Sequence, residues 1–142
     1  MKWKYFLVIL FLVLAMFLVG CNSIGVTPSD DEAKIKSVVY EYFLAINDQN
    51  WSKAKSCCVY GSDRYYKTCV IEDTVKVLYQ YSSIVTITCV VNITNVSIYG
   101  NNADACGYGT IIITAGYYSD SDSGSSCYHL QKVGNSWKIY GP

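Results

Sequence analysis

Residues 84–98, Ile-Val-Thr-Ile-Thr-Cys-Val-Val-Asn-Ile-Thr-Asn-Val-Ser-Ile, carry the pattern that decides the fold. Apolar and polar residues alternate through most of this segment, and the apolar series is Val85, Ile87, Cys89, Val91 and Ile93. Such alternation predicts a strand with one buried face. Beyond Asn95 the apolar positions move to Val96 and Ile98. Because side chains in a strand alternate with period two, this change requires a bulge or bend near Asn92–Asn95 and therefore a curved sheet.

The rest of the chain after this strand predicts an antiparallel meander. Gly100-Asn101-Asn102 is typical of a turn, and Gly134-Asn135 of a two-residue turn before the last strand. We expect strands over residues 103–118, 127–133 and 136–140, and a solvated loop over residues 120–126. Small residues share one face of the strand 103–118, where they would let a helix lie close: Ala103, Ala105, Gly107 and Gly109.

Helices are predicted before the sheet. Ser29-Asp30-Asp31-Glu32 has the Ser-x-x-Glu form of a capping box, with acidic residues in the first turn. Apolar residues then recur at spacings of three and four, as in one face of a helix: Ile35, Val38, Val39, Tyr42, Phe43 and Ile46. A polar break at residues 47–50 precedes a short second helix over Trp51–Cys58. Residues 59–82 are less regular, with a turn at 61–63 and room for a third short helix.

The N-terminus has the parts of an export signal. Lys2 and Lys4 precede an apolar run over residues 5–19, which is too short and too quickly interrupted by polar residues for a helix that spans about 30 Å of hydrocarbon. The run ends at Leu18-Val19-Gly20-Cys21, which resembles the lipobox of bacterial lipoproteins. The resemblance implies cleavage before Cys21, lipidation of that cysteine and attachment to the extracytoplasmic face of a cell membrane. A plain cleaved secretory signal is the alternative.

These boundaries divide the chain into a signal peptide at 1–20, a tether at 21–28 and one domain at 29–142. Removing the signal leaves nine basic residues against eleven acidic ones. Nucleic-acid binding needs clustered lysine and arginine, whereas here the lysines are scattered and the single arginine, Arg64, stands apart. We therefore expect no nucleic-acid partner.

Six cysteines remain besides Cys21, and an even number in an exported chain predicts disulfides: Cys57, Cys58, Cys69, Cys89, Cys106 and Cys127. Adjacent cysteines rarely bridge each other, so Cys57 and Cys58 should each have a separate partner. One possibility is a bridge from Cys57 or Cys58 to Cys69. The spacing matches neither a zinc site nor a Cys-x-x-Cys redox pair. We expect up to three disulfides, no metal and no cofactor.

The order of helices and strands resembles the nuclear transport factor 2-like, or cystatin-like, superfamily. The segments that carry the resemblance are 47–54, 96–103 with its Gly-Asn turn, and 129–139 with its Trp-Lys-Ile ending. The resemblance implies an α+β cone in which N-terminal helices pack on a curved antiparallel sheet and enclose a pocket. Enzymes of this type place an aspartate or a His-Asp pair in that pocket. The many cysteines depart from the family's usual pattern.

No catalytic residue is assigned from the sequence. His129 and Asp104 alternate with residues expected to face the helices, so both should lie on the opposite side of the sheet. Glu72 and Asp73 fall in the irregular stretch and stay open as pocket carboxylates. Five tyrosines are candidates to line a groove for a glycan or peptide, with ordinary packing as the alternative: Tyr65, Tyr66, Tyr108, Tyr117 and Tyr118.

The function favoured by the sequence is non-catalytic binding of a small ligand, a glycan or a cell-envelope protein. Two other classes stay open. One is an isomerase or dehydratase with a pocket carboxylate, which the family resemblance implies. The other is an assembly subunit of an envelope complex, or a homodimer formed through the open sheet face.

Overall fold

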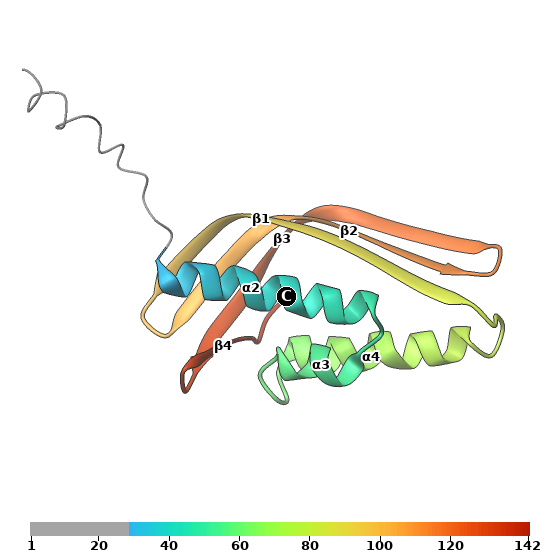
Figure 1. Cartoon of the computed structure of the whole chain (residues 1–142), viewed down its shortest axis with the longest axis horizontal. Helices are drawn as coiled ribbons and strands as arrows, with labels where there is room; N and C mark the ends of the chain where they lie inside the picture. The colour runs from blue at the N-terminus through green and yellow to red at the C-terminus, as the bar shows by residue number, and fades with distance from the viewer. Residues whose placement is uncertain (1–28) are drawn as a thin grey trace, which may run out of the picture.

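The computed structural model describes residues 29–142, which form three helices and one four-stranded sheet (Figure 1). The elements in chain order are α2 (Asp30–Asn47), α3 (Trp51–Ser56), α4 (Asp63–Leu78), β1 (Val85–Tyr99), β2 (Asn102–Ala115), β3 (Tyr118–Val133) and β4 (Ser136–Ile139). The sheet arches over the helices, which lie on its concave side. The predicted α+β class is confirmed, and the third helix is longer than expected. The signal peptide, the tether and Cys21 lie outside the described residues.

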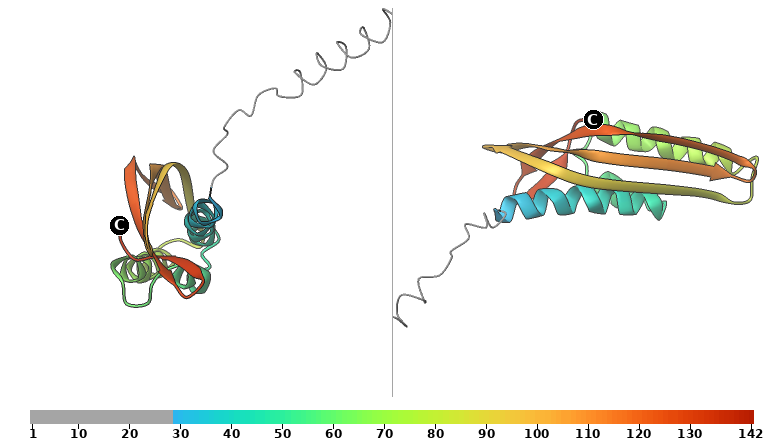
Figure 2. Two further views of the ribbon diagram at one scale, coloured as in Figure 1. Left: turned by 90° about the vertical axis from the view of Figure 1, so that its left-hand side faces the viewer. Right: turned by 90° about the horizontal axis from the view of Figure 1, so that it is seen from above.

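The sheet is an antiparallel meander in the order β1-β2-β3-β4, and its curvature begins where the sequence predicts it. The β1–β2 register shifts between Ile93 and Asn95, so Thr94 has no partner and forms the bulge. Gly107 lies across from this point, and a Cβ placed there would lie 2.0 Å from the carbonyl oxygen of Asn92. Gly107 is therefore needed for the close approach of β1, rather than for contact with a helix as we expected. Figure 2 shows the resulting long, bent sheet from two further sides.

The core lies between the concave face of the sheet and α2. Ser29 caps this helix, because its Oγ accepts a hydrogen bond from the Glu32 N–H at 3.1 Å. The apolar stripe of α2 faces inward, as predicted, and meets the inward series of β1 and the C-terminal strands. Fully buried or nearly buried members include Ile35, Val39, Tyr42, Ile46, Val85, Ile87, Leu130, Trp137 and Ile139.

The prediction of a loop over residues 120–126 is wrong, because these residues belong to β3. Ala115 pairs with Tyr118, so the chain reverses at Gly116 and Tyr117, and Gly116 has the positive φ of 62° that such a turn requires. The first half of β3 is exposed on both faces and has no strand beyond it, so its side chains lack the alternation that marks a half-buried strand.

Within residues 29–142 there is one disulfide, between Cys106 and Cys127, which are directly paired on β2 and β3. This bridge joins two of the six candidate cysteines and lies within the expected maximum of three. The other four described cysteines are thiols, including Cys69 and both of its expected partners: Cys57, Cys58, Cys69 and Cys89. Cys58 is instead packed inside the helical layer, where its thiol contacts the Ala54 carbonyl at 3.5 Å. None of the helices in this part of the chain is both long and apolar enough to cross a membrane.

Candidate functional site: a pocket under the curved sheet

A pocket of about 290 Å³ lies between the concave face of the sheet and helices α2 and α4. Its floor is formed where Gly109 of β2 pairs with Gly124 of β3. Neither residue has a side chain to fill the space, and a Cβ placed on Gly124 would meet no atom within 4 Å. The hollow therefore follows from two glycines that adjacent strands bring together on one row of the sheet.

Aromatic and aliphatic side chains form the walls of this pocket. The ring of Phe43 lies 5.1 Å from that of Tyr42 and 5.4 Å from that of Tyr128, both edge to face. Ile46 extends the wall along α2, and Ile71 contributes from α4. Such a lining binds the apolar body of a small molecule by excluding water from it.

Arg64 brings the one guanidinium of the chain into the pocket. Ser62 caps α4, accepting a hydrogen bond from the Tyr65 N–H, and this turn places Arg64 over the sheet. Its Cζ lies 5.2 Å from the centre of the Tyr42 ring and 4.9 Å from that of Tyr128. Its Nε is buried and has no hydrogen-bond partner among residues 29–142. The side chain is therefore held by two aromatic faces while a strong donor is left unsatisfied.

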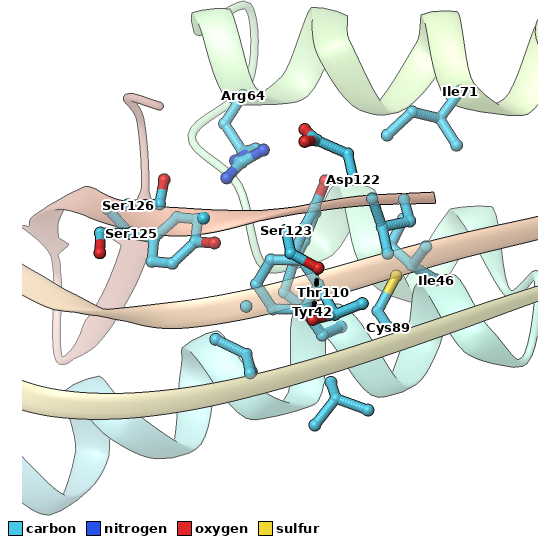
Figure 3. A pocket seen from close by; sticks show the side chains of 17 residues that line it. Tyr42, Ile46, Arg64, Ile71, Cys89, Thr110, Asp122, Ser123, Ser125 and Ser126 are labelled. Atoms are coloured by element: carbon cyan, nitrogen blue, oxygen red, sulfur yellow. Dashed lines mark hydrogen bonds between the residues drawn. The ribbon is translucent and has the colours of Figure 1, made fainter. Parts of the chain in front are cut away.

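Asp122 is the pocket carboxylate. It shares a row with Ile111 and Cys89 on the concave face, and Figure 3 shows its side chain projecting into the space between β3 and α4. Next to it, Thr110 Oγ1 and Ser123 Oγ are hydrogen-bonded at 2.9 Å. Asp122 is itself exposed, so the pocket does not enclose it as the catalytic carboxyl of a dry site would be enclosed.

The hydroxyl of Tyr42 is engaged away from the pocket. Thr68 donates its hydroxyl proton to the Arg64 carbonyl at 2.8 Å, so Thr68 Oγ1 accepts a hydrogen bond from Tyr42 at 3.1 Å. Burial raises the pKa of Tyr42, which keeps the phenol protonated at neutral pH. This contact links α2 to α4 and fixes both the tyrosine ring and the start of the arginine side chain.

His129 and Asp104 lie on the convex face, as predicted, and they form a pair there. His129 Nδ1 lies 2.5 Å from Asp104 Oδ1. The pKa of Asp104 is lowered, first by a hydrogen bond from the Tyr99 hydroxyl and then by the bond to His129. The same contact with Asp104 raises the pKa of Tyr99 to about 12. None of these groups lines the pocket, so the His-Asp pair that the family resemblance suggested is absent from its expected place.

The five tyrosines proposed for a groove do not come together on one surface. Tyr65 and Tyr66 form an edge-to-face pair at the start of α4. Tyr108 is on the convex face of β2, while Tyr117 is fully exposed at the β2–β3 turn and Tyr118 follows it. Their role in binding stays a prediction.

Glu72 and Asp73 are not pocket carboxylates. Glu72 forms ion pairs with Lys55 and Lys76, and its hydrogen bond from Lys55 is the main reason that its pKa is lowered. Asp73 is exposed beside Lys76. Residues 29–142 contain no cluster of three or more histidine, cysteine or acidic side chains that could hold a metal ion.

The sequence reasoning missed Arg64, Asp122 and the paired glycines of the floor. Arg64 is the single arginine of the chain, and in the sequence its isolation argues only against nucleic-acid binding. The polar sequence of residues 120–126 predicts a loop, and a loop there conceals the strand register that places Gly109 beside Gly124. Correct placement of the Gly116 turn would have brought the two glycines together.

No protein-family model and no curated protein matches this chain. Solved structures do. An NTF2-like protein with a cystatin-like fold from Novosphingobium aromaticivorans matches with a TM-score of 0.59 at 12% identity, over 78% of each chain. The chain has the nuclear transport factor 2-like fold. The curved meander and the helices on its concave side are the features of this fold that enclose the pocket.

Two further matches to the NTF2-like fold carry names of enzymes. A putative dehydratase of the NTF2-like family from Streptomyces avermitilis matches with a TM-score of 0.60 at 11% identity, over 80% of this chain and 94% of that one. A ketosteroid isomerase-like protein from Erwinia carotovora atroseptica matches with a TM-score of 0.60 at 12% identity, over 79% and 92%. At such identities the likeness shows the fold alone.

Proposed function

We propose that this chain is a lipid-anchored binding module, and that its pocket holds a small molecule with an apolar body and one anionic group. The observation that carries the proposal is the buried Nε of Arg64, which lies in an aromatic pocket without a hydrogen-bond partner among residues 29–142. A buried donor without a partner is costly, and a carboxylate or sulfonate would satisfy it with a charge-assisted bond. The glycine floor leaves room for the apolar body.

The test uses the anionic dye anilinonaphthalene sulfonate, which has an apolar ring system and one negative group. Binding to the wild-type domain should raise its fluorescence in a saturable way. Arg64→Met should raise the dissociation constant of the dye about tenfold or more, because it removes one charge-assisted contact. Lys67→Met removes the same charge from an exposed position on the same helix and should leave the affinity unchanged.

Gly124→Leu provides a second, steric test. Its side chain would enter the open space above the floor and should abolish dye binding, while circular dichroism and the unfolding midpoint stay close to those of the wild type. Equal dye affinity in the wild type, Arg64→Met and Gly124→Leu would contradict the proposal.

An isomerase or dehydratase is the second candidate, and Asp122 is the residue that favours it. Its carboxylate projects into the pocket, and two structural neighbours are named as a putative dehydratase and a ketosteroid isomerase-like protein. Catalysis would use Asp122 as the base that removes a proton next to a carbonyl group, with Arg64 stabilising the developing negative charge. Isomerisation of a β,γ-unsaturated ketosteroid by the wild type, lost in Asp122→Asn, would support this candidate. Equal rates in both proteins would reject it.

The membrane attachment is tested separately. Intact mass spectrometry of protein extracted from bacterial membranes should show cleavage before Cys21 and the mass of a diacylglycerol on that residue. Cys21→Ser should release the domain or leave the signal uncleaved. A cleaved, unmodified chain would instead indicate a plain secretory signal.

A further inference from the structure

The Cys106–Cys127 bridge lies on the convex face of the sheet, away from the pocket. Its two cysteines are directly opposite each other in the β2–β3 register, and their neighbours along each strand point the other way. Cys127 is exposed and Cys106 is half-buried. A shallow groove of about 400 Å³ runs over the bridge and is lined besides by Thr94, Tyr108, Ser125 and Ser126. Exposed disulfides are the ones that exchange with external thiols, whereas buried ones are protected.

The next row on the same face carries the Asp104–His129 pair. Asp104 is two residues from Cys106, and His129 is two residues from Cys127, so all four side chains lie on one side of the sheet. Residues two apart along a strand are separated by about 7 Å. His129 therefore lies one row away from the bridge, on the same face of the sheet.

Neighbouring groups fix the histidine in one orientation. Asp104 accepts a hydrogen bond from His129 Nδ1 at 2.5 Å and is itself held by the Tyr99 hydroxyl. The centre of the Tyr140 ring lies 6.0 Å from that of the imidazole. With Nδ1 bound to the carboxylate, Nε2 is the nitrogen left to accept and donate a proton. The charged and titratable groups that face His129 are thus Asp104, Tyr99 and Tyr140.

We propose that the Cys106–Cys127 bridge is a thiol–disulfide exchange site for dithiols, with His129 as its proton carrier. A thiol of the dithiol gives its proton to His129 Nε2, and the resulting thiolate attacks Cys127 Sγ. The Cys106–Cys127 bond breaks, its electron pair stays on Cys106 Sγ, and His129 returns the proton there. The second thiol of the dithiol then attacks the dithiol's own sulfur in the mixed disulfide, the bond to Cys127 Sγ breaks, and Cys127 takes up the proton that the second thiol loses. The dithiol is oxidised by two electrons, and the bridge is reduced to two thiols.

The buried thiols Cys58 and Cys89 do not compete for this role. Burial raises the pKa of Cys58 and of Cys89 to about 11, and neither reaches the convex face. The β2–β3 ladder continues on both sides of the bridge, so the hairpin keeps its register when the bridge opens. This site goes beyond the proposed binding function and shares no residue with it except Ser125 and Ser126, at the edge of the pocket.

The test measures opening of the bridge by dithiothreitol in the folded domain, with iodoacetamide quenching and mass mapping of Cys106 and Cys127. We expect opening at a rate that does not rise with low concentrations of urea. His129→Gln should slow it about tenfold at pH 7, because general acid–base assistance is lost. Asp104→Asn should slow it less, and the exposed Gln131→Ala, one row further from the bridge, should match the wild type. The ratio of wild-type to His129→Gln rates, measured from pH 5 to 9, should vary with pH.

Two outcomes would overturn the proposal. In the first, the bridge opens only at the rate of global unfolding, and urea accelerates its opening. This result would mean that the bridge has only a structural role. In the second, the wild type and His129→Gln open at the same rate at every pH. Circular dichroism and the unfolding midpoint show that each variant is folded before its rate is interpreted.

Discussion

The side-chain amide of Asn47 hydrogen-bonds both backbone groups of Cys89. Its Nδ2 donates to the Cys89 carbonyl at 3.0 Å, and its Oδ1 accepts from the Cys89 N–H at 2.5 Å. Cys89 belongs to β1, whose outer edge has no strand beside it. Gln49 Nε2 similarly donates to the Val85 carbonyl at 2.8 Å. The end of α2 thus occupies the edge of β1, where open backbone groups would otherwise pair with another chain.

Asn47→Ala should therefore lower the free energy of unfolding by about 1–3 kcal/mol, because two part-buried backbone groups lose their partners. Urea unfolding followed by circular dichroism measures this change. Asp48→Ala, at the exposed next position, should change stability by less than about 0.5 kcal/mol. Similar stability of the two variants would show that water replaces the amide of Asn47 without cost.

Gly107→Ala should destabilise the domain by about 3 kcal/mol or more, because its Cβ would lie 2.0 Å from the Asn92 carbonyl oxygen. Both atoms are tied to the backbone, so the bulge of β1 has to move. Gly109→Ala is the matched control, since its Cβ would lie 3.3 Å from the Val90 carbonyl oxygen. Soluble expression and thermal melting compare the two. If Gly107→Ala melts within a degree or two of Gly109→Ala, the close approach of β1 and β2 is not a requirement of the fold.

Asp31 should make stability depend on pH. Its carboxylate accepts hydrogen bonds from Trp137 Nε1 at 3.1 Å and Lys132 Nζ at 3.0 Å, and these contacts, Trp137 first, lower the pKa of Asp31. The contribution is fully present above the ordinary carboxyl pKa of about 3.9 and is lost as the pH falls through the lowered folded value. The melting temperature of Asp31→Asn should lie below that of the wild type at pH 7, and the gap should close below about pH 4.

Asp120→Asn, which changes an exposed carboxyl of β3, serves as the control for this experiment and should show no such gap. If the difference in melting temperature between the wild type and Asp31→Asn stays constant from pH 7 to pH 3, the charge of Asp31 contributes nothing to the contact between α2 and the C-terminal strands.

The thiols should differ in reactivity. With a pKa of about 11, Cys58 and Cys89 are ionised in roughly one molecule per thousand at pH 8. Burial also raises the pKa of Cys57, whereas Cys69 is partly exposed. Iodoacetamide at pH 8 without reductant should thus label Cys69 first, and the other three only after denaturation. Peptide mapping measures this order, and rapid labelling of Cys58 or Cys89 in the folded domain would contradict it.

Much of the fold was readable from local pattern. The capped start at Ser29, the inward stripe of α2, the strand from Val85 and the bulge before Asn95 all depend on nearest neighbours along the chain. The Gly134-Asn135 turn was predicted for the same reason. The loop predicted over residues 120–126 is wrong because both faces of this segment are exposed. Its sequence is therefore as polar as that of a loop, although its backbone pairs with β2.

The sequence by itself determined the α+β class, the place of the sheet's bend and the opposite facing of His129 and Leu130, because period and turn chemistry are local. Tertiary structure alone decided the site. Gly109 and Gly124 form a floor only through strand register, and Arg64 reaches the rings of Tyr42 and Tyr128 only when α4 packs under the sheet. The choice of Cys127 as the partner of Cys106 has the same origin. Contacts between distant segments follow from how layers pack, and no local pattern encodes that packing.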